Sequence, residues 1–414
     1  MLGFRSVRRA PRARLLAAAA ALAIVLAEGA LAAPQNVILM IGDGMGFGHV
    51  EAARLYAGSP FAFEGAPHQA QMTTDSYTSQ QIGGPTDSAA AATAMSTGRK
   101  VHNTVVSVAV PGDVSELETL GETMKARGKS VGLVTTSYLT DATPAAMAAH
   151  ALIRIQTEAI ADDYLNDTRV DVLLGGGANG LMAGAGLAAG YTVVSDRAGL
   201  EALGTSAPGP VLGLFGDSSE GMPFEWDHAR GTDPGYDTLP FLHEMTSSAL
   251  SFLDDDPDGF FLMIEQEGTD RAGHQSGSGI DRIGRDVFAV LEFDRAVEAV
   301  LAWMAGRDDT LLLVTADHET GGLEVLGDNG VGFLPTVSWS TSDHTRTNVP
   351  VYAFGPSAEL VSGVIDNTDI RSIAIVPEPG TILLVAVGLA GLAARGRGRP
   401  RISGGTEPSR PRAP

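Results

Sequence analysis

Short apolar runs alternate with stretches of helical period from residue 36 onward, and this alternation predicts an α/β fold. Uninterrupted apolar runs are typical of strands buried on both faces of a parallel sheet. We expect such strands at 36–41, 130–135, 170–174, 260–264, 310–315 and 349–354. Helical spacing of apolar residues predicts helices over 115–127, 239–253 and 280–304. The pattern therefore predicts a central, mostly parallel sheet with helices on both faces.

Residues 178–238 interrupt this alternation. The segment is rich in glycine and has no clear period, and Met222-Pro223-Phe224-Glu225 stands out as a fixed point. We expect it to form insertions near the functional site and not a separate domain.

The stretch 84–98 (GPTDSAAAATAMSTG) predicts a helix that begins near Ser88. Alanine is the best helix former, and Thr86 or Asp87 is a suitable N-cap. The free N–H groups of a first helical turn favour an anion, so a hydroxyl at Ser88 could attack a phosphorus or acyl centre. The alternative is a capped helix of small residues that only packs closely against the sheet.

Polar residues gather where the predicted strands end. This is true of Asp43, Asp141, Glu265, Asp270, Asp317 and His318. Open α/β sheets build their sites at that edge. Carboxylates that converge there would repel one another strongly unless cations lay among them. A ligand set of Asp, His, Glu and Thr suits zinc, and one of Asp, Glu and Thr suits magnesium.

Composition narrows the function classes. The chain has 28 Lys and Arg against 49 Asp and Glu, a net charge of −21, which argues against nucleic-acid binding. It has no cysteine, so disulfides and thiolate ligands are excluded. Stability must come from core burial, metals or assembly, and metal ligands must be Asp, Glu and His.

Both ends of the chain look like processing signals. Residues 1–33 combine several arginines, the apolar run 15–27 and small residues before a cleavage site, which predicts a secretory signal peptide. The apolar run is too short to favour a membrane anchor. Residues 34–375 then remain, which is enough for one large α/β domain with insertions.

At the other end, Pro377-Glu378-Pro379 precedes the apolar run 381–394 and an arginine cluster. Residues 376–401 resemble the PEP-CTERM sorting signal of Gram-negative bacteria, although the chain continues through a tail at 402–414. The resemblance implies processing by an exosortase, and the alternative is an ordinary membrane anchor, for which the run is short. We expect an exported protein of the periplasm, cell envelope or extracellular matrix.

The chain resembles bacterial alkaline phosphatases in six blocks that follow the family order. They are NVILMIGDGMG (36–46), GPTDSAAAATAMSTG (84–98), DATPAAMAAH (141–150) followed by Arg154, EQEGTDRAGH (265–274), TADHET (315–320) and DHT (343–345). The resemblance implies a three-layer alkaline-phosphatase-like fold. It also implies metal-dependent hydrolysis of small phosphate monoesters through a phosphoserine, with release of inorganic phosphate outside the cytoplasm. A homodimer is compatible with it.

Carried over position by position, the resemblance implies Ser88 as the nucleophile and Arg154 as the clamp for phosphate. It implies two zinc ions and one magnesium ion. One zinc would bind Asp270, His274 and His344, and the other Asp43, Asp317 and His318. Magnesium would bind Asp43, Thr143 and Glu265, with Asp141 reaching it through water.

Spacing adds three expectations. Asp270 and His274 are four residues apart, so a helical turn would put them on one face. Arg154 is expected on a helix that begins near Pro144. The family motif is often Val-Glu-Gly, and here it is Ile-Glu-Gln-Glu-Gly; the five-residue gap to Asp270 identifies Glu265, and not Glu267, as the ligand.

Other readings stay open. Related metal-dependent enzymes cleave phosphodiesters, phosphonates or sulfate esters, but diesterase relatives generally lack the arginine clamp and the third set of metal ligands. A non-catalytic envelope protein would not require Ser88. The remaining histidines are expected to be structural or surface residues, namely His49, His68, His102, His150, His228 and His243.

Overall fold

A ten-stranded sheet crosses the part of the chain that the computed structural model describes, which is residues 33–376 without 207–208, 217–218 and 278. The strand order is β14 (Gly363–Asp366), β2 (His68–Thr73), β13 (Val349–Phe354), β8 (Thr310–Thr315), β1 (Asn36–Gly42), β7 (Phe260–Gln266), β3 (Ser130–Tyr138), β4 (Val172–Gly176), β6 (Val211–Phe215) and β5 (Thr192–Val194). In this order, every neighbouring pair from β8 to β5 is parallel, whereas β13 runs antiparallel to both of its neighbours. The predicted mostly parallel sheet is confirmed.

The register of the central strands brings their carboxyl ends to one edge. Strand β1 is buried at all seven positions, as its unbroken apolar run predicts. Its Ile41 lies opposite Glu265 of β7 and Thr315 of β8, and Glu265 in turn lies opposite Thr135 of β3. The segments that follow these strands therefore leave the sheet side by side.

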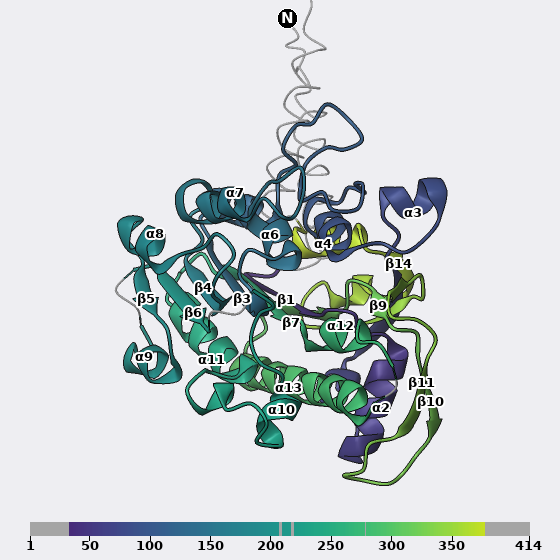
Figure 1. The fold of residues 1–414 in the computed structure, drawn as a ribbon. Coiled ribbons are helices and arrows are strands. Elements are labelled where there is room, and N and C mark those ends of the chain that lie inside the picture. Colours follow the sequence, from purple (N-terminus) through teal and green to yellow (C-terminus); the bar gives the residue numbers. More distant parts are fainter. Residues whose placement is uncertain (1–32, 207–208, 217–218, 278, 377–414) are drawn as a thin grey trace, which may run out of the picture. The chain divides into compact units, whose positions relative to one another are not determined.

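Helices cover both faces of the sheet, which confirms the three-layer architecture (Figure 1). On one face lie α4 (Ser88–Thr97), α6 (Ala142–Ala148) and α7 (Thr157–Asp162), with α5 (Leu120–Ala126) against α6 and α14 (Asp369–Ala374) against α4. On the other face lie α2 (Phe47–Ala57), α10 (Glu225–Ala229), α11 (Leu242–Leu253) and α13 (Ile280–Met304).

Several predicted elements agree with the structure residue by residue, and others differ at their ends. The strands at 310–315 and 349–354 and the helix at 280–304 have the predicted bounds. The helix expected over 115–127 is only α5, because Thr119 and Glu122 form a capping box that starts it at Leu120. Strand β3 continues three residues beyond the predicted end, to Tyr138.

The interpretation of 178–238 as irregular insertions was wrong in part. Within it, β6 and β5 extend the main sheet, and α8 (Ala183–Ala188) and α9 (Arg197–Ala202) accompany them. These elements are three to six residues long, too short to show a period in the sequence. The segment belongs to the same compact unit as the rest of 34–376, so the expectation of no separate domain agrees with the structure.

Smaller elements complete the fold. Two antiparallel pairs lie beside the sheet: β9 (Glu319–Thr320) with β12 (His344–Thr345), and β10 (Leu323–Gly327) with β11 (Thr336–Trp339). The remaining elements are η1 (Phe63–Gly65), α3 (Tyr77–Ile82), η2 (Asp163–Asp167), η3 (Gly235–Asp237), α12 (Gly268–Gly273) and η4 (Ala358–Leu360).

Within the described residues, none of the helices combines the length and the apolar character needed to cross a bilayer. The predicted leader and the sorting segment lie outside those residues, except for positions 33 and 376.

Candidate active site

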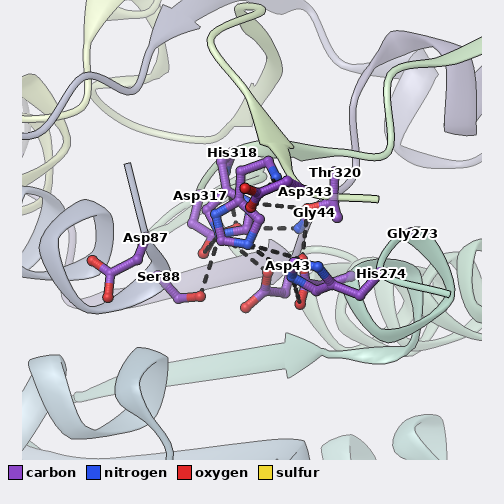
Figure 2. A network of polar contacts seen from close by, with 12 residues as sticks. Asp43, Gly44, Asp87, Ser88, Gly273, His274, Asp317, His318, Thr320 and Asp343 are labelled. Atoms are coloured by element: carbon purple, nitrogen blue, oxygen red, sulfur yellow. Dashed lines mark hydrogen bonds and ion pairs between the residues drawn. The ribbon is translucent and has the colours of Figure 1, made fainter. Parts of the chain in front are cut away.

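Ser88 is the first residue of α4, as the sequence predicted. Asp87 caps this helix by accepting a hydrogen bond from the Ala90 N–H at 3.1 Å, which settles the choice between the two candidate caps. Nine consecutive residues from Ser88 are buried, and their small side chains let the helix pack closely. Ser88 Oγ lies 3.3 Å from His318 Nε2, so the hydroxyl points into a group of polar side chains (Figure 2).

Asp43, Asp317 and His318 form one group beside this hydroxyl. Asp43 follows β1, and the other two follow β8. His318 Nε2 lies 3.2 Å from Asp317 Oδ2 and 3.6 Å from Asp43 Oδ1. The Gly44 N–H donates to Asp317 Oδ1 at 3.2 Å and fixes that carboxylate (Figure 2). One ligand atom of each residue lies within 4.8 Å of the others, which is close enough for a shared cation.

Asp270, His274 and His344 form a second group. His274 caps the C-terminus of α12, four residues after Asp270, and the β9–β12 pairing carries His344 to the same place. Their Nε2 atoms are 3.0 Å apart and lie 3.3 and 3.4 Å from the Asp270 carboxylate. The Nδ1 atoms face backbone carbonyls of Ser342 and Thr86, so each ring is held with Nε2 toward the group.

Asp43 also belongs to a third group, with Thr143 and Glu265. Thr143 lies on α6, and its hydroxyl donates to Asp43 Oδ2 at 3.4 Å. Glu265 Oε2 accepts a 2.5 Å hydrogen bond from Thr135. The structure thus brings the predicted direct metal ligands together, whereas Asp141, expected to reach magnesium through water, is hydrogen-bonded to Arg154 and Ser137.

Two residues near these groups were missed by the sequence analysis. Asp343 approaches His274 and His344, and Glu267 approaches Asp43 and Glu265 within 4.8 Å. Glu267 was set aside because the family spacing identifies Glu265 alone. A signal was present nonetheless: residues two apart at a strand end point to the same side, so Glu267 would face where Glu265 faces.

Arg154 reaches the site from a turn and not from a helix, so the expected helical position was wrong. Helix α6 ends at Ala148, and the extended chain that follows pairs Ala151 with Val106. Arg154 Nη2 donates to Asp141 Oδ1 at 2.7 Å, and its Nη1 lies 3.6 Å from Asp87 Oδ2. Burial alone would raise the pKa of Asp141, but the charge of Arg154 and the Ser137 hydrogen bond lower it.

The carboxylates in these groups repel one another. Burial and the neighbouring Asp317 raise the pKa of Asp43 well above its usual range, and burial and Asp141 raise that of Glu265 to about 8. Burial lowers the pKa of His318 well below its usual value, so its ring is neutral and can offer a lone pair.

Buried oxygens without a hydrogen-bond partner lie in the same place. They are Asp43 Oδ1, Glu265 Oε1, Glu267 Oε2 and Asp317 Oδ2. Buried charge of this kind is stable only when it is paired or coordinates a metal. The donor set therefore fits divalent cations, with nitrogen and oxygen ligands in two groups and oxygen ligands alone in the third.

A cavity of about 760 Å³ opens beside the three groups. Asp141, Glu267 and His274 line it, and the segment after β6 supplies Met222 and Phe224 to its wall. The expectation that 178–238 lies near the site therefore agrees with the structure.

Two of the histidines that the sequence analysis expected to be structural have partners outside the three groups. His49 is fully buried between Asp286 and Glu319, at 2.8 and 3.1 Å. His150 faces the Leu117 carbonyl and pairs with Glu122.

Comparisons with known proteins agree with this geometry. The family model of alkaline phosphatases matches residues 34–337 and 333–376, and that of the PEP-CTERM protein-sorting motif matches 376–398. Alkaline phosphatase 3 of Bacillus subtilis is 32% identical, over 81% of this chain and 87% of its own length. Streptomycin-6-phosphate phosphatase of Streptomyces griseus is 35% identical, over 81% and 88%.

Among solved structures, the alkaline phosphatase of the Antarctic bacterium TAB5 matches with a TM-score of 0.70 and 29% identity, over 83% of this chain and 98% of its own. A mutant of that enzyme, solved with magnesium in its M3 site, matches with a TM-score of 0.69.

Proposed function

The chain belongs to the alkaline phosphatase family of metal-dependent phosphoric monoester hydrolases, and we propose that it cleaves phosphate monoesters through a phosphoserine on Ser88. The observation that carries this proposal is the position of Ser88 Oγ, 3.3 Å from His318 Nε2 at the start of α4. A buried hydroxyl at a helix N-terminus, next to candidate metal ligands, is placed for attack on an anionic centre.

The three groups of side chains would hold two zinc ions and one magnesium ion. One zinc site is Asp270, His274 and His344; the other is Asp43, Asp317 and His318; the magnesium site is Asp43, Thr143 and Glu265, with Asp141 reaching it through water. The mixed nitrogen and oxygen ligands of the first two and the oxygen ligands of the third support this assignment. When bound, such cations lower the pKa of a hydroxyl or water and stabilise negative charge.

The residues of the chain then perform two displacements at phosphorus. In the first, Ser88 Oγ bonds to phosphorus and the bond to the alcohol oxygen breaks, so the alcohol leaves and takes up a proton. In the second, water attacks the same phosphorus, the bond to Ser88 breaks, and inorganic phosphate leaves. Arg154 binds two non-bridging oxygens with its planar fork, and the N–H groups of α4 add positive potential.

Arg154 also favours monoesters over diesters. A monoester has three non-bridging oxygens, so two can bind the guanidinium of Arg154 and the third can bind the cations. A diester has only two non-bridging oxygens and cannot make all of these contacts. The contact with Asp141 at 2.7 Å holds the guanidinium in position before substrate binds. The alcohol portion would occupy the cavity of about 760 Å³, which has room for a small organic group.

The sorting motif indicates an exported protein. We place its activity in the periplasm, cell envelope or extracellular matrix, after an exosortase-type enzyme has processed the C-terminal segment. Full-length protein and a variant with Pro377-Glu378-Pro379 replaced by alanines would be compared in the native host. Loss of processing in the variant is the expected result, and unchanged processing would contradict the assignment.

The test of the reaction is a trapped phosphoenzyme. Protein mixed with p-nitrophenyl phosphate and quenched in acid should gain the mass of one phosphate, and Ser88→Ala should not. Ser96→Ala, on the same helix, is the matched control and should gain it like the parent. An adduct that persists in Ser88→Ala would remove Ser88 from the role of nucleophile.

A further inference from the structure

Glu267 is a buried carboxylate without a role in the reaction described above. It follows β7 directly, and its backbone is fixed because its N–H donates to Thr136 Oγ1 at 2.9 Å and its carbonyl accepts from the Arg271 N–H at 3.2 Å. Only 8% of the residue is exposed, and its Oε2 has no hydrogen-bond partner. A fixed, unpartnered buried oxygen implies a ligand that the chain itself does not supply.

The residues around Glu267 indicate that this ligand carries a positive charge. A carboxylate oxygen of Glu267 lies within 4.8 Å of ligand oxygens of Asp43 and Glu265, which also carry unpartnered buried oxygens. The negative charges of Asp141, Glu265 and Asp270 act on Glu267, and the positive charge of Arg271 offsets them only in part. Arg271 is directed elsewhere, since it donates to the Met222 carbonyl at 2.7 Å and lies over the Phe224 ring.

A role in binding the substrate fits these contacts poorly. Glu267 lines the cavity, as Asp141 does. A carboxylate there would repel a phosphate ester unless its charge were neutralised by a cation. The same cation would satisfy the unpartnered oxygens of Asp43 and Glu265.

We propose that Glu267 is an additional ligand of the magnesium site, which in this chain would hold its cation with Asp43, Glu265 and Glu267 and with the Thr143 hydroxyl. The inference rests on the proposed magnesium site. Three carboxylates and no nitrogen make this a hard-oxygen site, so it takes magnesium or manganese in preference to zinc.

The experiment measures cation binding directly. Zinc-loaded protein freed of magnesium is titrated with MgCl₂ by calorimetry, and bound magnesium is counted by elemental analysis. Glu267→Gln keeps the shape of the side chain and removes its charge. We expect its dissociation constant for magnesium to rise about tenfold or more, because even residues that only orient metal ligands have effects of this size. Glu225→Gln, a buried glutamate outside the three groups, is the matched control and should bind like the parent.

Thermal unfolding separates a ligand from a merely structural residue. As a ligand, Glu267 adds repulsion when the cation is absent, so Glu267→Gln should melt higher than the parent without magnesium and gain less when it is added. A variant that melts lower in both conditions and binds magnesium normally would overturn the proposal.

Glu265→Gln distinguishes this inference from the proposed function. If Glu265→Gln loses magnesium and Glu267→Gln keeps the parent's affinity, Glu267 is not a ligand although the site stands. If the parent itself binds no magnesium, the third site of the proposed function fails, and this inference fails with it.

Discussion

Arg154 is positioned by two carboxylates before any substrate arrives. Its guanidinium contacts Asp141 at 2.7 Å and approaches Asp87 at 3.6 Å, and Asp87 at the same time caps α4 next to Ser88. One set of side chains therefore fixes both the helix that begins at Ser88, the proposed nucleophile, and the guanidinium of the proposed phosphate clamp. This coupling makes the site sensitive to single residues.

Arg154→Ala should reduce kcat/KM for p-nitrophenyl phosphate about 100-fold or more, since two charge-assisted hydrogen bonds are lost. The loss should be smaller for bis(p-nitrophenyl) phosphate, and inhibition by inorganic phosphate should weaken. Arg307→Ala, which removes a pair with Asp254 away from the site, is the control. Equal losses on both esters would count against the monoesterase assignment.

Glu225 gives a prediction on pH. Burial, and then the charge of Glu292, raise its pKa to about 7, whereas an unfolded glutamate titrates near about 4.3. Between these values the folded state binds more protons than the unfolded state, so the free energy of unfolding falls as pH rises. Glu225→Gln removes this contribution.

The free energy of unfolding of Glu225→Gln, relative to the parent, should therefore increase from about pH 5 to about pH 8 and then level off. Urea unfolding across that range measures it. Glu324→Gln, at an exposed position, should give a flat difference. A flat difference for Glu225→Gln as well would show that its carboxyl titrates normally.

At the scale of elements, residues 221–224 form a fixed wall of the cavity, and Glu225 anchors them. The Met222 N–H donates to the Thr136 carbonyl of β3 at 2.8 Å, and Glu225 accepts from Gln266 of β7 at 3.1 Å. Phe224 contacts two guanidinium groups, with Arg271 at 4.3 Å and Arg285 at 4.7 Å from its ring centre. These two cation–π contacts restrain the ring, as a residue that sets specificity requires.

Phe224→Ala should therefore act on the alcohol portion of the substrate. We expect KM for aryl phosphates to rise about tenfold, since the apolar contact of one phenyl ring is lost, with little change for ethyl phosphate. Steady-state kinetics on both esters measures the difference. Phe333→Ala, at an exposed position, serves as the control. Equal effects on both esters would mean that the ring supports the fold and not the cavity.

At the scale of the whole molecule, the apolar core and the three groups of candidate metal ligands are built on the same sheet. The central strands that bury the apolar core also end in the carboxylates of the site, so the charge of these groups acts on the folded state as a whole. Without cations, unpartnered buried oxygens remain at the sheet edge. Cations that bind only the folded state then contribute to its stability.

Removal of the metals by chelation should lower Tm by about 10 °C, which corresponds to binding energies of a few kcal/mol in a domain of this size. Readdition of zinc should restore part of the activity and stability, and magnesium should add to both. A reducing agent should change neither, because the chain has no cysteine. An unchanged Tm, in protein shown by elemental analysis to be metal-free, would contradict a role of the metals in stability.

The sequence by itself determined the fold class, and it predicted candidate site residues that follow the ends of the central strands. Fully buried parallel strands require unbroken apolar runs, so β1 and β8 were visible as such, and the polar residues after them had to meet at one edge. The sequence also limited the cap of α4 to Thr86 or Asp87, because a cap depends on neighbours in the chain, and the structure identified Asp87.

Only the tertiary structure decided what depends on contacts between distant segments. Strands β5 and β6 are too short to show a period and are stabilised by pairing along the sheet. Arg154 lies in a turn because the chain after α6 pairs with Val106, far back in the sequence. Glu267 follows Glu265 by two residues, but only the register of β1 with β7 brings it within reach of Asp43.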